Sequence, residues 1–387
     1  MNKIYLDNAS TTFPKPEEVP RAVFDYMTRS GVNINRSSYA DAYRAEELVF
    51  DTRQMLCDLF HGPDCRNVIF TKNITESLNV LLKGFLKPGD HVLVSSMEHN
   101  AVMRPLVQLA DCGVTFSRVP CDSCGVLQPE ALEECIRPET KAVVMTHASN
   151  VCGTVLPLRR VGEFCRERGL RFFVDSAQTA GVLPLDMVQM HIDALAFTGH
   201  KGLLGPQGIG GFVLGKGMEA HIEPLLSGGT GSLSHTEEVP SFLPDRYEPG
   251  TMNIPGIVGL HAGLTWLAGR EEGEILTHEL ELTRAFLEGI RPLEEEGKLR
   301  IAGKRDCTGR VGVVSLQTPG MDPAKAAYEM EVGYGIMTRV GLHCAPSAHT
   351  SLGTYPTGTI RFSFGFWNTM EEVAAALKAL REVTHGV

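Results

Sequence analysis

The segment RFFVDSAQ, residues 171–178, combines a short apolar run with an aspartate and several small or polar residues. An apolar run of this length, bounded by turn-forming residues, predicts a buried strand. Asp175 then lies at the carboxyl end of that strand. An aspartate in this position often only caps the following helix, so the segment taken alone leaves its role open.

The same pattern repeats on both sides of this segment, from about residue 66 to 215. Short apolar runs alternate with helical stretches, which favours an α/β fold with a mostly parallel sheet covered on both faces. We expect seven strands, at residues 67–70, 91–94, 114–119, 142–146, 171–174, 194–197 and 210–214. The helices between them are expected at residues 76–86, 101–110, 129–136 and 158–168.

Polar and turn-forming side chains follow five of these strands, and this is the edge where parallel sheets bind ligands. The five stretches are TKNITE (71–76), MEHN (97–100), HASN (147–150), DSAQ (175–178) and TGHK (198–201). One such stretch would mean little, but five of them indicate one shared site.

Lys201 gives this site a chemical identity. It follows an apolar strand and lies between Gly199 and Gly202, which we expect to let the backbone approach a ligand closely. A desolvated lysine can lose its proton and attack an aldehyde. Paired with Asp175 as the partner of a pyridine nitrogen, it predicts a site for pyridoxal 5′-phosphate (PLP). Thr198 and His200 could donate to the phosphate.

The remainder of the chain predicts a smaller α+β domain. A Gly- and Pro-rich stretch at residues 227–255 interrupts the alternation, and a long helical region follows at about 258–296. Short strands near residues 310–316 and 359–364 and a closing helix from Met370 come next. We expect a large PLP-binding domain at residues 15–255 and a small domain formed by residues 1–14 and 256–387.

Composition limits the partners. The net charge is −10, with 36 basic and 46 acidic side chains scattered along the chain, which disfavours nucleic acid or an anionic membrane as a main partner.

The N-terminus has no apolar stretch typical of a signal peptide and no later run approaches a membrane span, so we expect a cytoplasmic location. Ten irregularly spaced cysteines indicate reduced thiols. Cys121 and Cys124 have a zinc-like spacing but no second ligand pair, so no metal site is expected.

Several stretches together resemble the class V aminotransferase family, which has PLP fold type I, and within it the cysteine desulfurases and selenocysteine lyases. They are YLDNASTTFPKP, FTKNITESLN, HVLVSSMEHNAVMRP, THASNVCGT, FVDSAQTAG, FTGHKGLLGPQGIG, PDRYEPGTMNIPG, MTRVGLHCAP and IRFSFGFWNT. The resemblance runs from residue 5 to about residue 369, nearly the whole chain.

The resemblance implies a role for each matching residue. The cofactor would be bound by Lys201 at its aldehyde, Asp175 at the ring nitrogen, Gln178 and Asn150 near the phenolic oxygen, His99 on the ring face, and Thr75, Thr198 and His200 at the phosphate. Thr251 would complete the phosphate site of a second copy, which implies a homodimer. Arg361 would bind the substrate α-carboxylate, with Asn150 close by, and His99 would relay protons. For an arbitrary lone arginine, a surface ion pair is the usual alternative.

Cys344 indicates which of the reactions of this family to expect. It lies in RVGLHCAP, a stretch typical of a loop, where His343 and Arg339 could favour its thiolate. A free loop cysteine is most often incidental, but the resemblance to the second group of desulfurases implies a persulfide on Cys344. The expected activity is conversion of L-cysteine to L-alanine, with sulfur passed to an acceptor protein that the sequence does not identify. A selenocysteine lyase, another PLP-dependent transaminase or lyase, and a non-catalytic partner protein are the alternatives.

Overall fold

The computed structural model describes residues 3–34 and 39–385. Among these residues, none of the helices has the length and apolar character needed to span a bilayer. The strands are β1 (Ile4–Tyr5), β2 (Val68–Thr71), β3 (His91–Ser95), β4 (Thr115–Val119), β5 (Thr140–Thr146), β6 (Arg171–Asp175), β7 (Ala194–Thr198), β8 (Gly210–Leu214), β9 (Arg300–Ala302), β10 (Val313–Gln317), β11 (Ile336–Met337), β12 (Arg339–Gly341) and β13 (Thr359–Ser363). The helices are α1 (Glu18–Arg29), α2 (Ala40–Phe60), α3 (Ile74–Phe85), α4 (Asn100–Ala110), α5 (Ala131–Cys135), α6 (Leu158–Arg168), α7 (Ile254–Ala268), α8 (Glu274–Glu295), α9 (Pro323–Tyr334), α10 (Pro346–Ser351) and α11 (Met370–His385).

A seven-stranded sheet lies at the centre of the larger part of the described chain, in the order β2-β8-β7-β6-β5-β3-β4. β8 runs antiparallel to both of its neighbours, and the remaining pairs are parallel. The mostly parallel seven-stranded sheet predicted from the sequence is therefore confirmed, with each strand close to its expected position.

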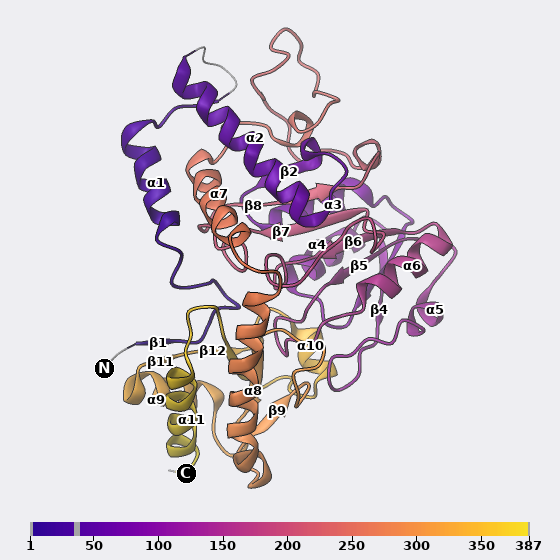
Figure 1. Ribbon diagram of the computed structural model, residues 1–387. Helices are drawn as coiled ribbons and strands as arrows, with labels where there is room; N and C mark the ends of the chain where they lie inside the picture. The colour runs from indigo at the N-terminus through magenta and orange to yellow at the C-terminus, as the bar shows by residue number, and fades with distance from the viewer. Residues whose placement is uncertain (1–2, 35–38, 386–387) are drawn as a thin grey trace.

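Side chains along each strand alternate between two apolar layers. Phe172 belongs to the layer that packs with α2, α6 and α7, whereas its neighbour Phe173 belongs to the layer that packs with α3 and α4. Helices lie on either side of the sheet in Figure 1. Because both faces are buried, the strands are continuous apolar runs instead of alternating polar and apolar residues.

A second sheet lies below the first in Figure 1 and has the order β12-β13-β10-β9. All of its strand pairs are antiparallel. Its core includes Phe286 of α8, Met330 of α9 and Leu380 of α11. At the other end of the sequence, β1 pairs with β11, and Asp7 then forms a β-bridge with Ser363 at the end of β13. The first and last parts of the chain thus share this smaller unit.

The long helical region expected at residues 258–296 is divided into two helices, α7 and α8. Gly273 precedes α8 with a φ of 79°, a left-handed conformation that favours glycine. α7 contacts α1 and α2, whereas α8 packs against α11 of the smaller unit. The limits of the two domains remain a prediction. The boundary depends on α7, which lies in the predicted small domain by sequence but contacts α1 and α2.

The strand order brings the predicted site residues to one edge. β5, β6 and β7 are parallel neighbours, with Thr146 beside Asp175 and Asp175 beside Ala196. The polar stretches that follow these strands must therefore meet at the carboxyl edge of the sheet.

Two helical glycines test this packing. A Cβ on Gly162 in α6 would overlap the carbonyl oxygen of Met190, whereas a Cβ on Gly333 in α9 would have no neighbour within 4 Å. We expect Gly162→Ala to lower the free energy of unfolding by about 1–3 kcal/mol through overpacking. Gly333→Ala should raise it by about 0.5–1 kcal/mol because alanine favours a helix. Thermal unfolding followed by circular dichroism compares the two, and equal midpoints would contradict the close contact at Gly162.

Candidate active site

Lys201 and Asp175 lie at the carboxyl ends of two adjacent strands, β7 and β6. Asp175 is buried, and burial raises the pKa of its carboxyl group. The N–H of Ala177 donates to its Oδ1 at 2.9 Å and, together with the charge of Lys201, acts in the opposite direction. The amine and the carboxyl group therefore lie close enough for each charge to act on the other.

The amine of Lys201 loses its proton more easily than that of an ordinary lysine. Burial lowers the pKa of its amine to about 8, the cation of Arg361 acts in the same direction, and Asp175 opposes them. Gly199 and Gly202, which flank Lys201, are expected from the sequence to allow close approach of a ligand, but their neighbours in the structure give a different reason for glycine. A Cβ on Gly199 would press on Ile209 and one on Gly202 would overlap the carbonyl oxygen of Ala180, so both glycines allow close packing of protein backbone.

Two buried donors near Lys201 have no hydrogen-bond partner among the described residues. These are the hydroxyl of Thr198 and Nδ1 of His200. Burial lowers the pKa of His200 to about 4, so its ring is neutral. Buried polar atoms without partners are uncommon in proteins, and a phosphate would accept hydrogen bonds from both. With a lysine of lowered pKa and a buried carboxyl group beside them, these donors fit the phosphate, aldehyde and ring nitrogen of PLP. Thr75, in the first turn of α3, is exposed.

His99 caps α4 and is neutral at physiological pH. Its Nδ1 accepts the N–H of Ala101 at 3.0 Å, so the hydrogen of the neutral ring is on Nε2. Burial, followed by the charges of Lys201 and nearby arginines, lowers its pKa to about 4. The preceding residue, Glu98, is fully buried and accepts hydrogen bonds from the Ser95 hydroxyl and the Thr146 N–H. Burial raises the pKa of Glu98 to about 8. We assigned Glu98 no role from the sequence, although it stands in one of the five polar stretches.

Asn150 and Gln178 hold neighbouring loops in this structure. The Nδ2 of Asn150 donates to the carbonyl oxygen of His343 at 2.7 Å, and the Nε2 of Gln178 donates to that of Ala9 at 3.1 Å. Gln178 and Lys201 line one cavity of about 40 Å³. Gln178 therefore lies beside Lys201 and contacts the N-terminal segment, whereas Asn150 contacts the turn that contains Cys344.

Cys344 is exposed and lies in a turn, as the sequence predicts. His343 and Cys344 have φ values of 47° and 57°, a left-handed conformation that is unfavourable for both side chains. The N–H of Asn100 donates to the Cys344 carbonyl oxygen at 2.7 Å. Nη2 of Arg339 lies 3.9 Å from Sγ. Burial lowers the pKa of His343 to about 2, so this neutral ring supplies no charge to the thiol and Arg339 is the nearby cation.

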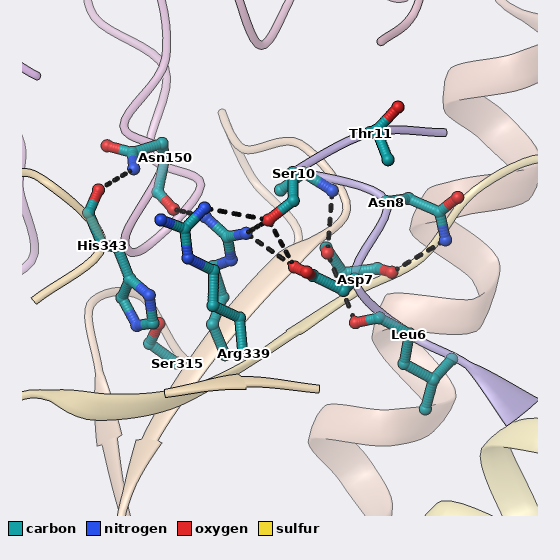
Figure 2. A network of polar contacts seen from close by, with 12 residues as sticks. Leu6, Asp7, Asn8, Ser10, Thr11, Asn150, Ser315, Arg339 and His343 are labelled. Carbon is teal, nitrogen blue, oxygen red and sulfur yellow. Dashed lines mark hydrogen bonds and ion pairs between the residues drawn. The ribbon is translucent and has the colours of Figure 1, made fainter. Parts of the chain in front are cut away.

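Arg361 is fully buried, which excludes the alternative of a surface ion pair. Its Nη2 donates to Asp7 Oδ1 and to Ser10 Oγ, each at 2.7 Å, and its Nη1 donates to the carbonyl oxygen of Asn150 at 3.0 Å. Figure 2 shows Asp7, Ser10 and Asn150 around this network. Asp7 and Ser10 had no assigned role, although their stretch YLDNASTTFPKP was among those that suggested the family.

One depression on the surface brings part of the predicted set together. Thr75, His99 and Cys344 all line it, together with Arg104. Thr251 lies elsewhere, in a groove that Phe70 and other residues line. The chain therefore does not bring its own Thr251 into the depression that contains Cys344. In the described residues, no group of three or more His, Cys, Asp or Glu side chains could hold a metal ion.

Comparison with known proteins gives a consistent result. The family model described as Aminotransferase class-V matches residues 4–376. A protein of Methanothermobacter thermautotrophicus named "Probable cysteine desulfurase" is 32% identical, covering 98% of this chain and 94% of its own length. "Cysteine desulfurase CsdA" of Escherichia coli is 31% identical, covering 97% and 93%. The apo structure of a cysteine desulfurase from Thermococcus onnurineus is 31% identical with a TM-score of 0.92, covering 100% of this chain and 95% of that one.

The lowered pKa of Lys201 predicts a pH-dependent stability. An amine with a pKa of about 8 in the folded protein and 10.5 otherwise binds a proton more weakly when folded. Stability should therefore rise as the pH increases between these values, and the full cost of about 3 kcal/mol applies below pH 8. We expect Lys201→Met to stabilise the protein at pH 7 and to do so less near pH 9.5, as measured by urea unfolding.

Lys216→Met is the matched control, because Lys216 is exposed. It should change the free energy of unfolding by less than about 0.5 kcal/mol at either pH. The same gain for Lys201→Met at both pH values would contradict the lowered pKa.

Proposed function

The chain belongs to the class V aminotransferase family, and we propose that it is a PLP-dependent cysteine desulfurase that converts L-cysteine to L-alanine and carries the released sulfur as a persulfide on Cys344. One observation supports this above the others. Cys344, an exposed thiol in a turn, lines the same depression as His99, and the charge of Lys201 acts on His99. The relatives named cysteine desulfurase, which align with nearly the whole chain, agree with it.

The cofactor would be held by residues with separate tasks. Lys201 would bind its aldehyde, Asp175 would face its ring nitrogen, and Thr198 and His200 would donate to its phosphate. Thr75 adds a donor at the start of α3, where the helix dipole favours an anion. His99, Asn150 and Gln178 would lie around the ring. When bound, PLP supplies an electron sink for the electrons left on the substrate carbon.

The substrate would be bound by its carboxylate. Arg361 has a buried Nε that no other residue of the described chain contacts by a hydrogen bond, so a donor is left for the α-carboxylate beside the contacts to Asp7 and Ser10. The amine of Lys201 can then take the α-proton at Nζ, because a pKa of about 8 leaves part of it neutral at physiological pH. His99 remains neutral above about pH 4 and can move a proton through Nε2.

Cys344 accepts the sulfur of the substrate. Its thiolate attacks the substrate sulfur, a new S–S bond forms, and the Cβ–S bond of the substrate breaks. The electron pair left on carbon takes a proton, and the product is L-alanine. Nη2 of Arg339 lies 3.9 Å from Sγ, beside the reacting sulfur. Exposure of the turn allows the persulfide to reach an acceptor protein.

We further propose that the protein is a homodimer and that it works in a reducing compartment. Thr251 is exposed in its groove, where it is available to the phosphate site of a partner subunit in a homodimer. All ten cysteines are free, a state typical of proteins in reducing compartments, so we propose that the enzyme works in the cytoplasm. Light scattering of the purified protein measures the mass of the assembly.

Cofactor binding can be measured without turnover. Purified protein mixed with PLP and freed of excess should be yellow. Lys201→Ala should lose the visible absorbance of lysine-bound cofactor, because the amine proposed to bind the aldehyde is removed. Lys216→Ala is the control, since this exposed lysine should leave the colour unchanged. A colourless wild type after addition of PLP would defeat the cofactor proposal.

The role of Cys344 is tested by comparison with Cys112, another exposed free cysteine. Cys344→Ser should keep the yellow colour, yet release of sulfide from L-cysteine in the presence of dithiothreitol should fall by roughly a hundredfold or more. Mass spectrometry of protein mixed with L-cysteine should detect one added sulfur atom in the wild type and in Cys112→Ser. Full activity in Cys344→Ser would mean that the thiol takes no part.

A further inference from the structure

A buried ion pair beside the large sheet holds the segment that carries Thr251. Arg53 lies in α2 and Glu248 lies three residues before Thr251, and their side chains are only 7% and 6% exposed. Nη1 of Arg53 donates to Oε1 of Glu248 at 2.8 Å, and Nη2 donates to Oε2. Nη1 also donates to the carbonyl oxygen of Val68 in β2. A planar guanidinium bound in this way fixes both the position and the orientation of the carboxylate.

The carboxylate of Glu248 is also bound directly to β2. The N–H of Phe70 donates to its Oε1 at 2.6 Å, and the guanidinium of Arg53 lies over the Phe70 ring, 4.6 Å from the centroid. In the part of the chain that the structure describes, Arg53 is the only cation in an ion pair with Glu248. Removal of Arg53 would therefore leave a buried carboxylate without its counter-charge, which is costly enough to displace the segment.

Thr251 lies between two fixed points of this short segment. Glu248 is the first of them. The second is Asn253, whose Oδ1 accepts the N–H of Gly256 at the start of α7 and whose Nδ2 donates to the carbonyl oxygen of Gly208 at 2.7 Å. Thr251 itself is exposed. Its hydroxyl is therefore presented to the outside by a segment that side chains hold at both ends.

The groove that contains Thr251 lies next to the predicted phosphate site on α3. Glu76 and Val80 line this groove, whereas Thr75 and Asn79, each one position earlier on the helix, line the neighbouring depression. Consecutive positions on a helix are about 100° apart, so the groove and the depression occupy adjacent faces of α3. A second copy that packs over these faces would place Thr251 of one subunit near the phosphate site of the other.

We propose that Arg53 is a positioning residue for the cofactor of the partner subunit. Through Glu248 it holds Thr251 where the hydroxyl can donate to the phosphate that the other subunit binds. The inference rests on the proposed function, which places Thr251 at the second phosphate site of a homodimer. Because Arg53 and that phosphate belong to different chains, loss of Arg53 should weaken cofactor binding in the other subunit more than in its own.

Mixed dimers distinguish the two subunits. Two chains with different affinity tags are produced together and purified over both tags. One of them carries Lys201→Ala, so each dimer keeps a single amine for the aldehyde of PLP. Titration with PLP, followed by the absorbance of lysine-bound cofactor, then gives the dissociation constant of that one site without any turnover.

Arg53→Met is placed in one chain or in the other. In the chain with Lys201→Ala it removes the support of the Thr251 that serves the intact site. The dissociation constant for PLP should then rise by about tenfold, as expected for loss of one hydrogen bond to a charged group. In the chain with the intact Lys201, the constant should stay within about threefold of that of the dimer without Arg53→Met.

Two further variants separate positioning from stability. Arg66→Met removes an exposed arginine that pairs with Asp64 and should leave the dissociation constant unchanged in either chain. If Arg53→Met does not fold, Arg53→Met combined with Glu248→Gln removes both charges, so no unpaired charge is buried. The amide oxygen of the glutamine still accepts the N–H of Phe70. The loss of affinity should again be larger when the change lies in the chain with Lys201→Ala.

Equal dissociation constants for the two placements would overturn the proposal, as would a larger loss when the change lies in the chain with the intact Lys201. A failure of the proposed function looks different. Wild-type protein that binds no PLP would refute the cofactor, and a monomer in light scattering would refute the homodimer and with it the role of Arg53. A dimer that binds PLP but releases no sulfide from L-cysteine would refute the desulfurase, whereas the comparison of the two placements would still decide the role of Arg53.

Discussion

Burial of the Arg361 guanidinium is the constraint on which the arrangement of the site depends. A charge with no access to water needs partners, and removal of one partner from a buried pair typically costs about 3–5 kcal/mol. The partners of Arg361 come from separate parts of the chain: Asp7 and Ser10 near the N-terminus and the carbonyl oxygen of Asn150 after β5. These contacts fix the small sheet against the large one. They therefore fix the position of a bound carboxylate relative to Lys201.

The sequence predicts the large sheet well because each of its strands is buried on both faces. Such strands are uninterrupted apolar runs, and the helices between them have clear polar and apolar sides. The smaller unit is harder to predict. β11 has two residues, and β9 and β12 have three each, too few for any periodicity to be visible. The division between α7 and α8 depends on the backbone conformation of Gly273, which composition does not reveal.

The site was predictable where a residue type has a chemical meaning by itself. Lys201, Asp175 and Cys344 are of this kind, and the structure brings the first two together and leaves Cys344 exposed in a turn. The role of Asp7 was not predictable from the sequence. Its partner Arg361 is 354 positions away, and no local pattern indicates such a pair. Glu98 was missed for a different reason. A glutamate is usually solvated, and only the fold shows that this one is buried.

The β-bridge between Asp7 and Ser363 has a consequence for folding during synthesis of the chain. Asp7 leaves the ribosome before Ser363, which lies 356 positions later in the sequence (363 − 7 = 356). At roughly 5–20 residues per second, the N-terminal segment waits for tens of seconds before the strand that holds it exists. The nascent chain can form its large sheet during this time. The contact between Asp7 and Ser363, in contrast, forms only after β13 has been translated.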